Sequence, residues 1–181
     1  MIPQAALAAD QRFHGVVIGV VTDVVDPEGL GRVAICLPWY AAGYRRWARI
    51  AQLYAGPGYG STWVPEKDAE VLVAFAHGDM RWPYVVGCLF GKVDTPPHSR
   101  TRDADVRTLR TPAGSELSFD ETKGEVTLKT PSGAAVTLRE KSGEITLTGK
   151  SKITLSAPQV VIEATGAGGA VTVTGERIAL N

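Results

Sequence analysis

Histidine and cysteine are the residues of this chain that most readily bind metals or take part in catalysis, and both are scarce. The histidines are His14, His77 and His98, and the cysteines are Cys36 and Cys88. None of them stands at the short, regular spacing of a metal-ligand set. No nucleophile elbow occurs, and no pair of carboxylates is set apart from ordinary surface charge. We therefore expect no catalytic centre, no metal and no cofactor, and we expect that the chain is not an enzyme.

Two glycine-containing stretches match phosphate-binding loops only in part. Gly149-Lys150-Ser151 matches the end of a P-loop, but Glu144 occupies the place of the first glycine and no helical pattern follows. The segment Gly56-Pro57-Gly58-Tyr59-Gly60 also lacks the helix that follows a dinucleotide-binding loop. Both stretches are predicted to be turns.

A basic and aromatic cluster is the one feature that suggests nucleic-acid binding. It consists of Arg45, Arg46, Trp47 and Arg49, with Tyr40 and Tyr44 nearby. Residues 1–95 contain 8 basic and 9 acidic residues, so no electropositive groove is evident. We expect no nucleic-acid partner, and a nucleic-acid-binding barrel stays open as an alternative function.

Composition gives no sign of a membrane or a secreted protein. The 181 residues carry 19 basic and 19 acidic side chains, and 44% of them are hydrophobic. No apolar run reaches the ~18 residues that would span a bilayer. Residues 1–13 lack the basic start of a secretory signal. The chain is thus expected to be made and assembled in the cytoplasm, with Cys36 and Cys88 reduced and buried in strands.

Aromatic residues divide the chain into two parts. Twelve of the thirteen lie before residue 93, and only Phe119 lies beyond. We predict an N-terminal extension at 1–13, a first domain at 14–92, a connector at 93–107 that contains Pro96-Pro97, and a second domain at 108–181. The first domain has five strand candidates, separated by Gly- and Pro-containing turns, at 15–25, 32–37, 47–54, 69–76 and 83–90. Five such strands predict a small Greek-key barrel of the OB type.

The second domain repeats an apolar–x–apolar triplet, which places two apolar side chains on one face of a strand. The triplets are Val126/Leu128, Val136/Leu138, Ile145/Leu147, Ile153/Leu155, Val160/Ile162, Val171/Val173 and Ile178/Leu180, with Leu117/Phe119 as a possible eighth. A ribbon of this kind cannot surround its own apolar stripe, whereas three copies about one axis can. The pattern favours an intertwined trimeric β-helix, with backbone hydrogen bonds between chains and the triplets from Val126 to Val173 in a dry core. A monomeric sandwich or a single-chain solenoid is the alternative.

An ordered set of motifs in the first domain carries a family resemblance. The motifs are Gly31-Arg32-Val33 to Leu37-Pro38-Trp39, Trp47 to Gln52, Tyr54 to Gly60, Val64-Pro65-Glu66 with Glu70 to Phe75, and His77-Gly78-Asp79 with Pro83 and Gly87. Together they resemble the OB domain of the phage baseplate assembly protein V and VgrG spike family, and the second domain resembles that family's triple-stranded β-helix. The resemblance implies a structural central spike of a contractile injection apparatus, which joins a hub to a tip and punctures the target envelope. Phage tail, tailocin and extracellular injection system remain open, and a trimeric host-binding fibre is a further alternative.

The resemblance also implies partners at both ends of the spike. The barrel begins about a dozen residues into the chain, so a separate hub protein is expected to dock on it. Some spikes of the family end in a metal point held by a His-x-His pair, but no histidine follows His98 here. The chain ends directly after a triplet, so we expect a cap of the PAAR-repeat type on Ile178, Leu180 and Asn181. The assembly would belong to a virion-like or extracellular injection particle and would contact the target membrane transiently.

Overall fold

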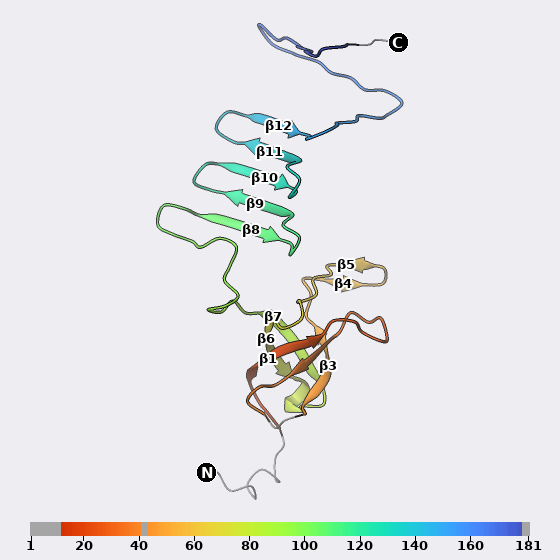
Figure 1. The fold of residues 1–181 in the computed structure, drawn as a ribbon, viewed down its shortest axis with the longest axis vertical. Coiled ribbons are helices and arrows are strands. Elements are labelled where there is room, and N and C mark those ends of the chain that lie inside the picture. Colours follow the sequence, from red (N-terminus) through yellow and green to blue (C-terminus); the bar gives the residue numbers. More distant parts are fainter. Residues whose placement is uncertain (1–11, 41–42, 179–181) are drawn as a thin grey trace, which may run out of the picture. The chain divides into compact units, whose positions relative to one another are not determined.

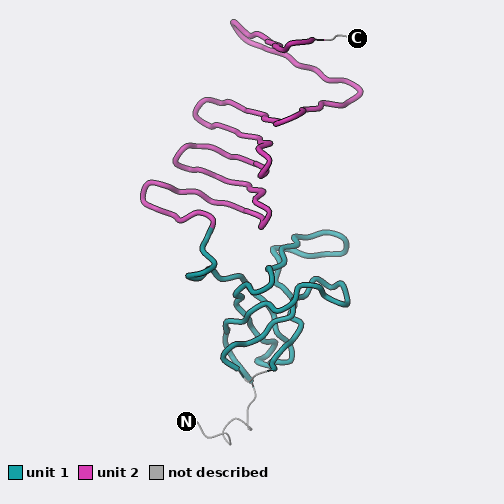
Figure 2. Tube along the Cα trace, viewed as in Figure 1, with its two compact units in different colours: residues 1–96 teal, residues 97–181 magenta. Residues whose placement is uncertain are grey.

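A computed structural model describes residues 12–40 and 43–178. The chain divides into two compact units, Met1–Pro96 and Pro97–Asn181 (Figure 2). Within the described residues all regular structure is β, apart from one short 3-10 turn, η2 (Ala76–Gly78). This confirms the all-β class. No helix in that part of the chain is long and apolar enough to cross a bilayer.

The first unit is a closed five-stranded barrel, as predicted (Figure 1). Its strand order is β1-β2-β3-β7-β6, and every neighbouring pair is antiparallel except β3 and β7, which are parallel. A short hairpin of β4 and β5 leaves the barrel between β3 and β6. The sequence predicts only a turn at this segment, residues 56–60. The bounds are β1 Val16–Asp23, β2 Val33–Cys36, β3 Arg45–Ile50, β4 Ala55–Gly56, β5 Tyr59–Gly60, β6 Glu70–Phe75 and β7 Pro83–Cys88.

Branched aliphatic side chains fill the barrel. The largest fully buried side chains are Val21, Val33, Ile35, Val71, Val73 and Val85. On β6 the buried positions alternate, because successive side chains of a strand point to opposite faces. Gly19 lets β1 approach this core closely, since a Cβ there would lie 2.9 Å from Val73 Cγ2. The barrel wall is thus fixed by small and β-branched residues.

The two cysteines depart from the expectation that both are buried. Each lies on a strand and each is a free thiol, but Cys36 is half-buried and Cys88 is exposed. The pairing of β6 with β7 shifts register between Leu72 and Val73, and the end of β7 beyond this irregularity leaves the core. The burial of Cys88 was therefore predicted wrongly.

A single carboxylate organises the turn between β1 and β2. Asp26 is 4% exposed, and its Oδ2 accepts hydrogen bonds from the backbone N–H groups of Leu30 and Arg32. The Arg32 guanidinium binds both oxygens of the same carboxylate, at 2.8 and 3.0 Å. The Arg32 hydrogen bonds hold the pKa of Asp26 well below its usual range. The predicted glycine turn is confirmed, with Gly29 at a φ of 65° and Gly31 at 69°.

The second unit is a one-layer antiparallel meander in the order β12-β11-β10-β9-β8 (Figure 1). The same turn occurs at 111–115 and again at 130–134, where a threonine N–H and hydroxyl both bond the carbonyl four residues later. The bounds of the strands are β8 Val106–Arg110, β9 Glu116–Asp120, β10 Glu125–Lys129, β11 Ala135–Arg139 and β12 Glu144–Thr148.

Two expectations about the second unit need correction for the single chain. The hydrogen-bond ladder from β8 to β12 runs within the chain, not between chains, because short turns keep consecutive strands adjacent. Beyond β12, residues 149–178 form no strand, although four predicted triplets begin there. A strand needs a neighbour for its N–H and C=O groups, and the described chain offers none to this segment.

We predict that the barrel core sets the stability of the first unit. Ile35→Ala should lower the free energy of unfolding by about 2–5 kcal/mol, since it leaves a cavity in a close-packed barrel. Val25 is 76% exposed, so Val25→Ala should change stability by less than about 0.5 kcal/mol. Denaturant unfolding followed by tryptophan fluorescence measures both. Equal effects would show that the core is assigned wrongly.

Candidate trimer interface

Strand register places the apolar triplets of the meander in two columns on one face. Residues directly opposite each other in an antiparallel pair lie on the same face of the sheet. One column contains Phe119, Val126, Leu138 and Ile145, and the other contains Leu117, Leu128, Val136 and Leu147. Leu109 of β8 extends the second column. The face thus gathers the first six predicted core residues, from Val126 to Leu147, and both residues of the possible eighth triplet.

The opposite face is polar. Its central column is made of hydroxyl residues, one from each strand: Thr108, Ser118, Thr127, Thr137 and Thr146. Charged residues flank this column, and Arg139 joins Glu125 at 2.9 Å and Glu144 at 3.1 Å. Hydroxyls and ion pairs are well solvated, so this face suits contact with water.

The apolar face is uncovered in the single chain. Ile145 is 69% exposed, Leu147 57% and Leu128 54%. A groove of about 380 Å³ lies at the strand ends joined by the turns after β9 and β11, and Phe119, Val126, Leu138 and Ile145 of this face are among its lining residues. Burying a large aliphatic side chain contributes about 1.5–3 kcal/mol, and a one-layer sheet cannot bury this face against itself. The face therefore has the composition of one side of a hydrophobic core.

The other predicted core residues are not brought together. Ile153, Leu155, Val160, Ile162, Val171 and Val173 lie in the segment without strands and are between 50% and 67% exposed. Of the predicted cap contacts, Ile178 is 55% exposed. Leu180 and Asn181 lie outside the described residues. The described side chains are therefore exposed, and no strand pairing brings them together.

The sequence analysis did not predict that a carboxylate at the start of β9 would be buried. Glu116 is 3% exposed, and its oxygens lie 3.0 Å from Lys129 Nζ, 3.7 Å from His98 Nε2 and 3.8 Å from Arg110 Nη1. Register explains two of these contacts, because Glu116 is directly opposite both Arg110 and Lys129. Charged residues at matching strand ends were the signal that could have revealed it. His98 belongs to the segment that precedes β8, so the cluster ties that segment to the sheet.

The charge of Glu116 depends on this cluster. Burial is the largest influence and by itself would raise the pKa of Glu116, but the Lys129 hydrogen bond, with His98 and Arg110, outweighs it and lowers the pKa. Within the described ranges, this cluster included, no three His, Cys, Asp or Glu side chains converge as a metal site requires.

An OB barrel followed by a meander with one unpartnered apolar face defines a class of two-domain, self-associating β-proteins. Two family models match the chain in the same order. The first, the type VI secretion system/phage-baseplate injector OB domain, covers residues 17–90. The second, the phage baseplate V C-terminal trimerisation domain, covers residues 107–172. The chain belongs to the phage baseplate V family.

Relatives with this region are spike proteins of bacterial secretion systems. The chain is 30% identical over 132 residues to the type VI secretion system spike protein VgrG3 of Vibrio cholerae, covering 67% of this chain and 13% of that protein. It is 32% identical over 123 residues to the actin cross-linking toxin VgrG1 of V. cholerae, covering 59% and 11%. For the spike protein VgrG4b of Pseudomonas aeruginosa the values are 31% over 122 residues, 61% and 15%. The chain spans less than a sixth of the length of these relatives.

We predict that the apolar face holds the assembly together. Ile145→Asp would bury one carboxylate per copy, which costs several kcal/mol for each unpaired ion, and should prevent trimer formation. Thr146→Asp is the matched control on the polar face, where Arg139 Nη1 already lies 3.2 Å from the threonine hydroxyl. Light scattering should show a trimer for Thr146→Asp and a smaller species for Ile145→Asp. The same outcome for both variants would mean that the two faces are assigned wrongly.

We also predict a pH-dependent contribution from Glu116. Its pKa is lower in the folded protein than the usual 4.5, so its ion pairs stabilise the fold above that pH and are lost as the pH falls below it. Glu116→Gln should therefore lower the unfolding temperature at neutral pH, and the difference from wild type should shrink as the pH falls below 4.5.

Glu121→Gln is the control for this experiment, because Glu121 pairs with Arg107 while 60% exposed. It should change the unfolding temperature little at any pH. Circular dichroism melts at several pH values measure both variants. A difference between wild type and Glu116→Gln that stays constant with pH would contradict the assigned charge.

Proposed function

We propose that the chain is the structural central spike of a contractile injection apparatus, which joins a hub to a tip and punctures the target envelope. The observation that carries this proposal is the uncovered apolar face of β9–β12, which lies inside a match to a trimerisation domain. Two relatives that share this region, VgrG3 and VgrG4b, are named type VI secretion system spike proteins. The apparatus would be a phage tail, a tailocin or an extracellular injection system.

A homotrimer would complete the second unit. Three equivalent faces turned towards one axis remove all the exposed columns from water together. The trimerisation match extends to residue 172, through the segment that forms no strand in the single chain. Its remaining triplets would gain strand neighbours from the other copies, so both hydrogen bonding and burial favour an intertwined needle. Such a needle resists bending, because hydrogen bonds and a dry core run along its length.

The proposed role is mechanical and not enzymatic. One relative is named an actin cross-linking toxin, and the region shared with this chain is 11% of that protein. The proposed spike is assembled in the cytoplasm, becomes part of a virion-like or extracellular particle and touches the target membrane only during injection. A host-binding fibre is the rival function, and it would require an exposed aromatic surface towards the distal end. Phe119 is the last aromatic residue of the chain.

Electron microscopy of particles from the producing cell tests this function. An antibody to the barrel should label one end of sheathed particles, and particles that carry Ile145→Asp should lose the spike and the killing or injection activity. Particles with Thr146→Asp should keep both. Absence of the chain from purified sheathed particles, or full activity with Ile145→Asp, would overturn the proposal.

We further propose a hub protein at the barrel and a PAAR-type cap beyond the needle. The exposed Ile178, after an equally exposed Val171 and Val173, supports an apolar contact there. A tagged trimer should recover a co-expressed PAAR protein, and deletion of residues 177–181 should abolish recovery by removing Ile178, Leu180 and Asn181. Glu163→Gln is the control and should leave recovery unchanged. Recovery that survives the deletion would place the cap elsewhere.

A further inference from the structure

A groove on the outside of the barrel is not used by any of the features described above. It has a volume of about 460 Å³ and lies over the paired strands β3 and β7. Trp47 and Arg49 come from β3, Tyr84 from β7, Trp82 from the residue before β7, and Leu30 and Arg32 from the turn that Asp26 organises. Arg49 is directly opposite Tyr84 in the parallel pair. Three aromatic residues from two chain segments therefore converge around the guanidinium groups of Arg32 and Arg49.

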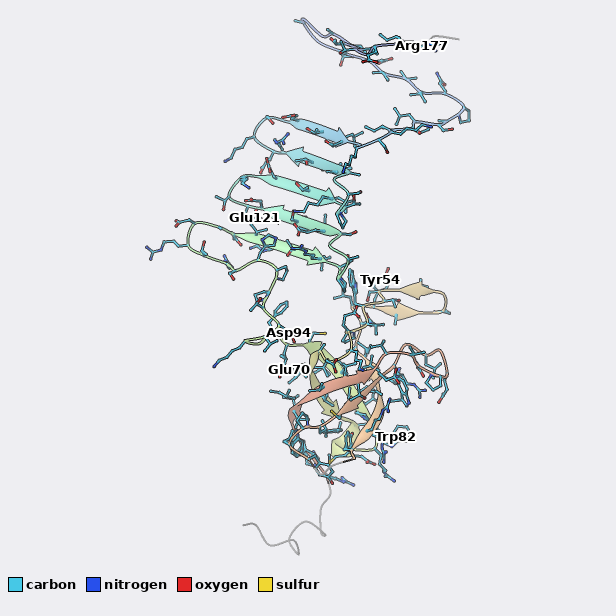
Figure 3. The ribbon with its side chains drawn as sticks, in the orientation of Figure 1. Tyr54, Glu70, Trp82, Asp94, Glu121 and Arg177 are labelled. Atoms are coloured by element: carbon cyan, nitrogen blue, oxygen red, sulfur yellow. The ribbon has the colours of Figure 1, made fainter. Side chains whose placement is uncertain are left out.

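The apolar walls of the groove are open to solvent. Trp82 is 63% exposed and Leu30 is 66% exposed. Figure 3 shows Trp82 on the outside of the barrel. Trp, Tyr and Arg are the residues most enriched at the energetic centres of protein interfaces, because each combines a large apolar surface with a polar group. An exposed groove that contains all three types fits a protein partner.

Ion pairs neutralise two of the four arginines along the groove and β3, while Arg46 and Arg49 form none with the described residues. Arg32 binds Asp26 at 2.8 Å and Glu28 at 2.9 Å, and Arg45 binds Asp23 at 3.0 Å. Nucleic-acid affinity comes mainly from several unpaired cations that each contact a phosphate. Two of the basic side chains along the groove and β3 are thus already neutralised, which disfavours a polyanion.

Arg49 differs from these neighbours. Its guanidinium stacks 5.9 Å over the Tyr84 ring, and no ion pair to it is found within residues 12–40 and 43–178. A guanidinium stacked on a ring keeps its N–H edge available for the two oxygens of a carboxylate. The groove therefore combines apolar walls with one cation whose charge is not neutralised.

We propose that this groove binds a protein segment in which one Asp or Glu side chain stands next to a large apolar side chain. The carboxylate pairs with Arg49, and the apolar side chain packs between Trp47, Trp82 and Leu30. This inference rests on the proposed function in one respect, since it identifies the segment as part of the hub protein that docks on the barrel. Binding to the groove itself can be measured without a particle.

A displayed library of random dodecapeptides, selected on the full-length chain, tests the proposal. Enriched peptides should share an acidic residue beside an aromatic or aliphatic one. Arg49→Gln and Trp82→Ala should each weaken binding of the best peptide by about tenfold, measured by calorimetry. Arg45→Gln is the matched control, because it changes an arginine on the same strand whose charge Asp23 already neutralises, and it should change the affinity less than twofold.

The other outcomes each exclude the proposal. No enriched peptide, enrichment without an acidic residue, or equal binding by Arg49→Gln would overturn it. Stronger binding of single-stranded oligothymidine than of peptide, lost in Arg49→Gln and steeply dependent on salt, would make the groove a nucleic-acid surface instead. Association of trimers that is lost in Trp82→Ala would make it a contact between copies.

Light scattering of the same samples separates this inference from the proposed spike. Peptide binding by a chain that is not a trimer would sustain the groove and refute the spike. A trimer without peptide binding would do the reverse. Circular dichroism of each variant should match wild type, since Trp82 and Arg49 lie outside the barrel core.

Discussion

A one-layer sheet with one apolar face is the constraint on which the second unit depends. In β9–β12 every strand contributes two large apolar side chains to the same face, and residues 12–40 and 43–178 supply no second layer to cover them. The hydrophobic effect acts on area exposed to water and not on particular partners, so any equivalent surface can satisfy it. The same face of another copy of the chain is such a surface, and its apolar columns have the same length and spacing. Self-association is thus the direct physical consequence of this composition.

Charged residues determine which face of the sheet stays in contact with water. The polar side carries a hydroxyl column flanked by ion pairs such as Arg139 with Glu125 and Glu144, which remain stable in water. Glu116 is the exception because it is almost fully buried, and Arg110 of β8, Lys129 of β10 and the imidazole of His98 surround it. A buried carboxylate without such partners would be strongly destabilising. The cluster therefore fixes the start of the meander at one register.

Ion pairs within the barrel determine the net charge that its surface presents. Arg32 and Arg45 are basic in the sequence but contribute little net charge, because Asp26, Glu28 and Asp23 neutralise them. Without this neutralisation, β3 would present a cationic and aromatic strip suited to nucleic acid. With it, the groove over β3 and β7 presents aromatic walls and Arg49, for which the described residues hold no ion pair, and this is closer to the composition of a protein-binding site.

Local patterns in the sequence were enough to predict the all-β class, the five barrel strands and the apolar face of β10–β12. Alternation with a period of two is a property of a few consecutive residues and needs no knowledge of the partner strand. The family resemblance could likewise be found from motifs such as Trp47 to Gln52, which can be recognised in the sequence without a structure. By contrast, the pairing of β8–β12 within one chain, the burial of Glu116 and the exposure of Cys88 depend on register between distant residues. That Arg49 has no ion pair with a described carboxylate also depends on which side chains meet across the barrel. Only the tertiary structure decided these features, because hydrogen bonds, ion pairs and burial join residues that the sequence keeps apart.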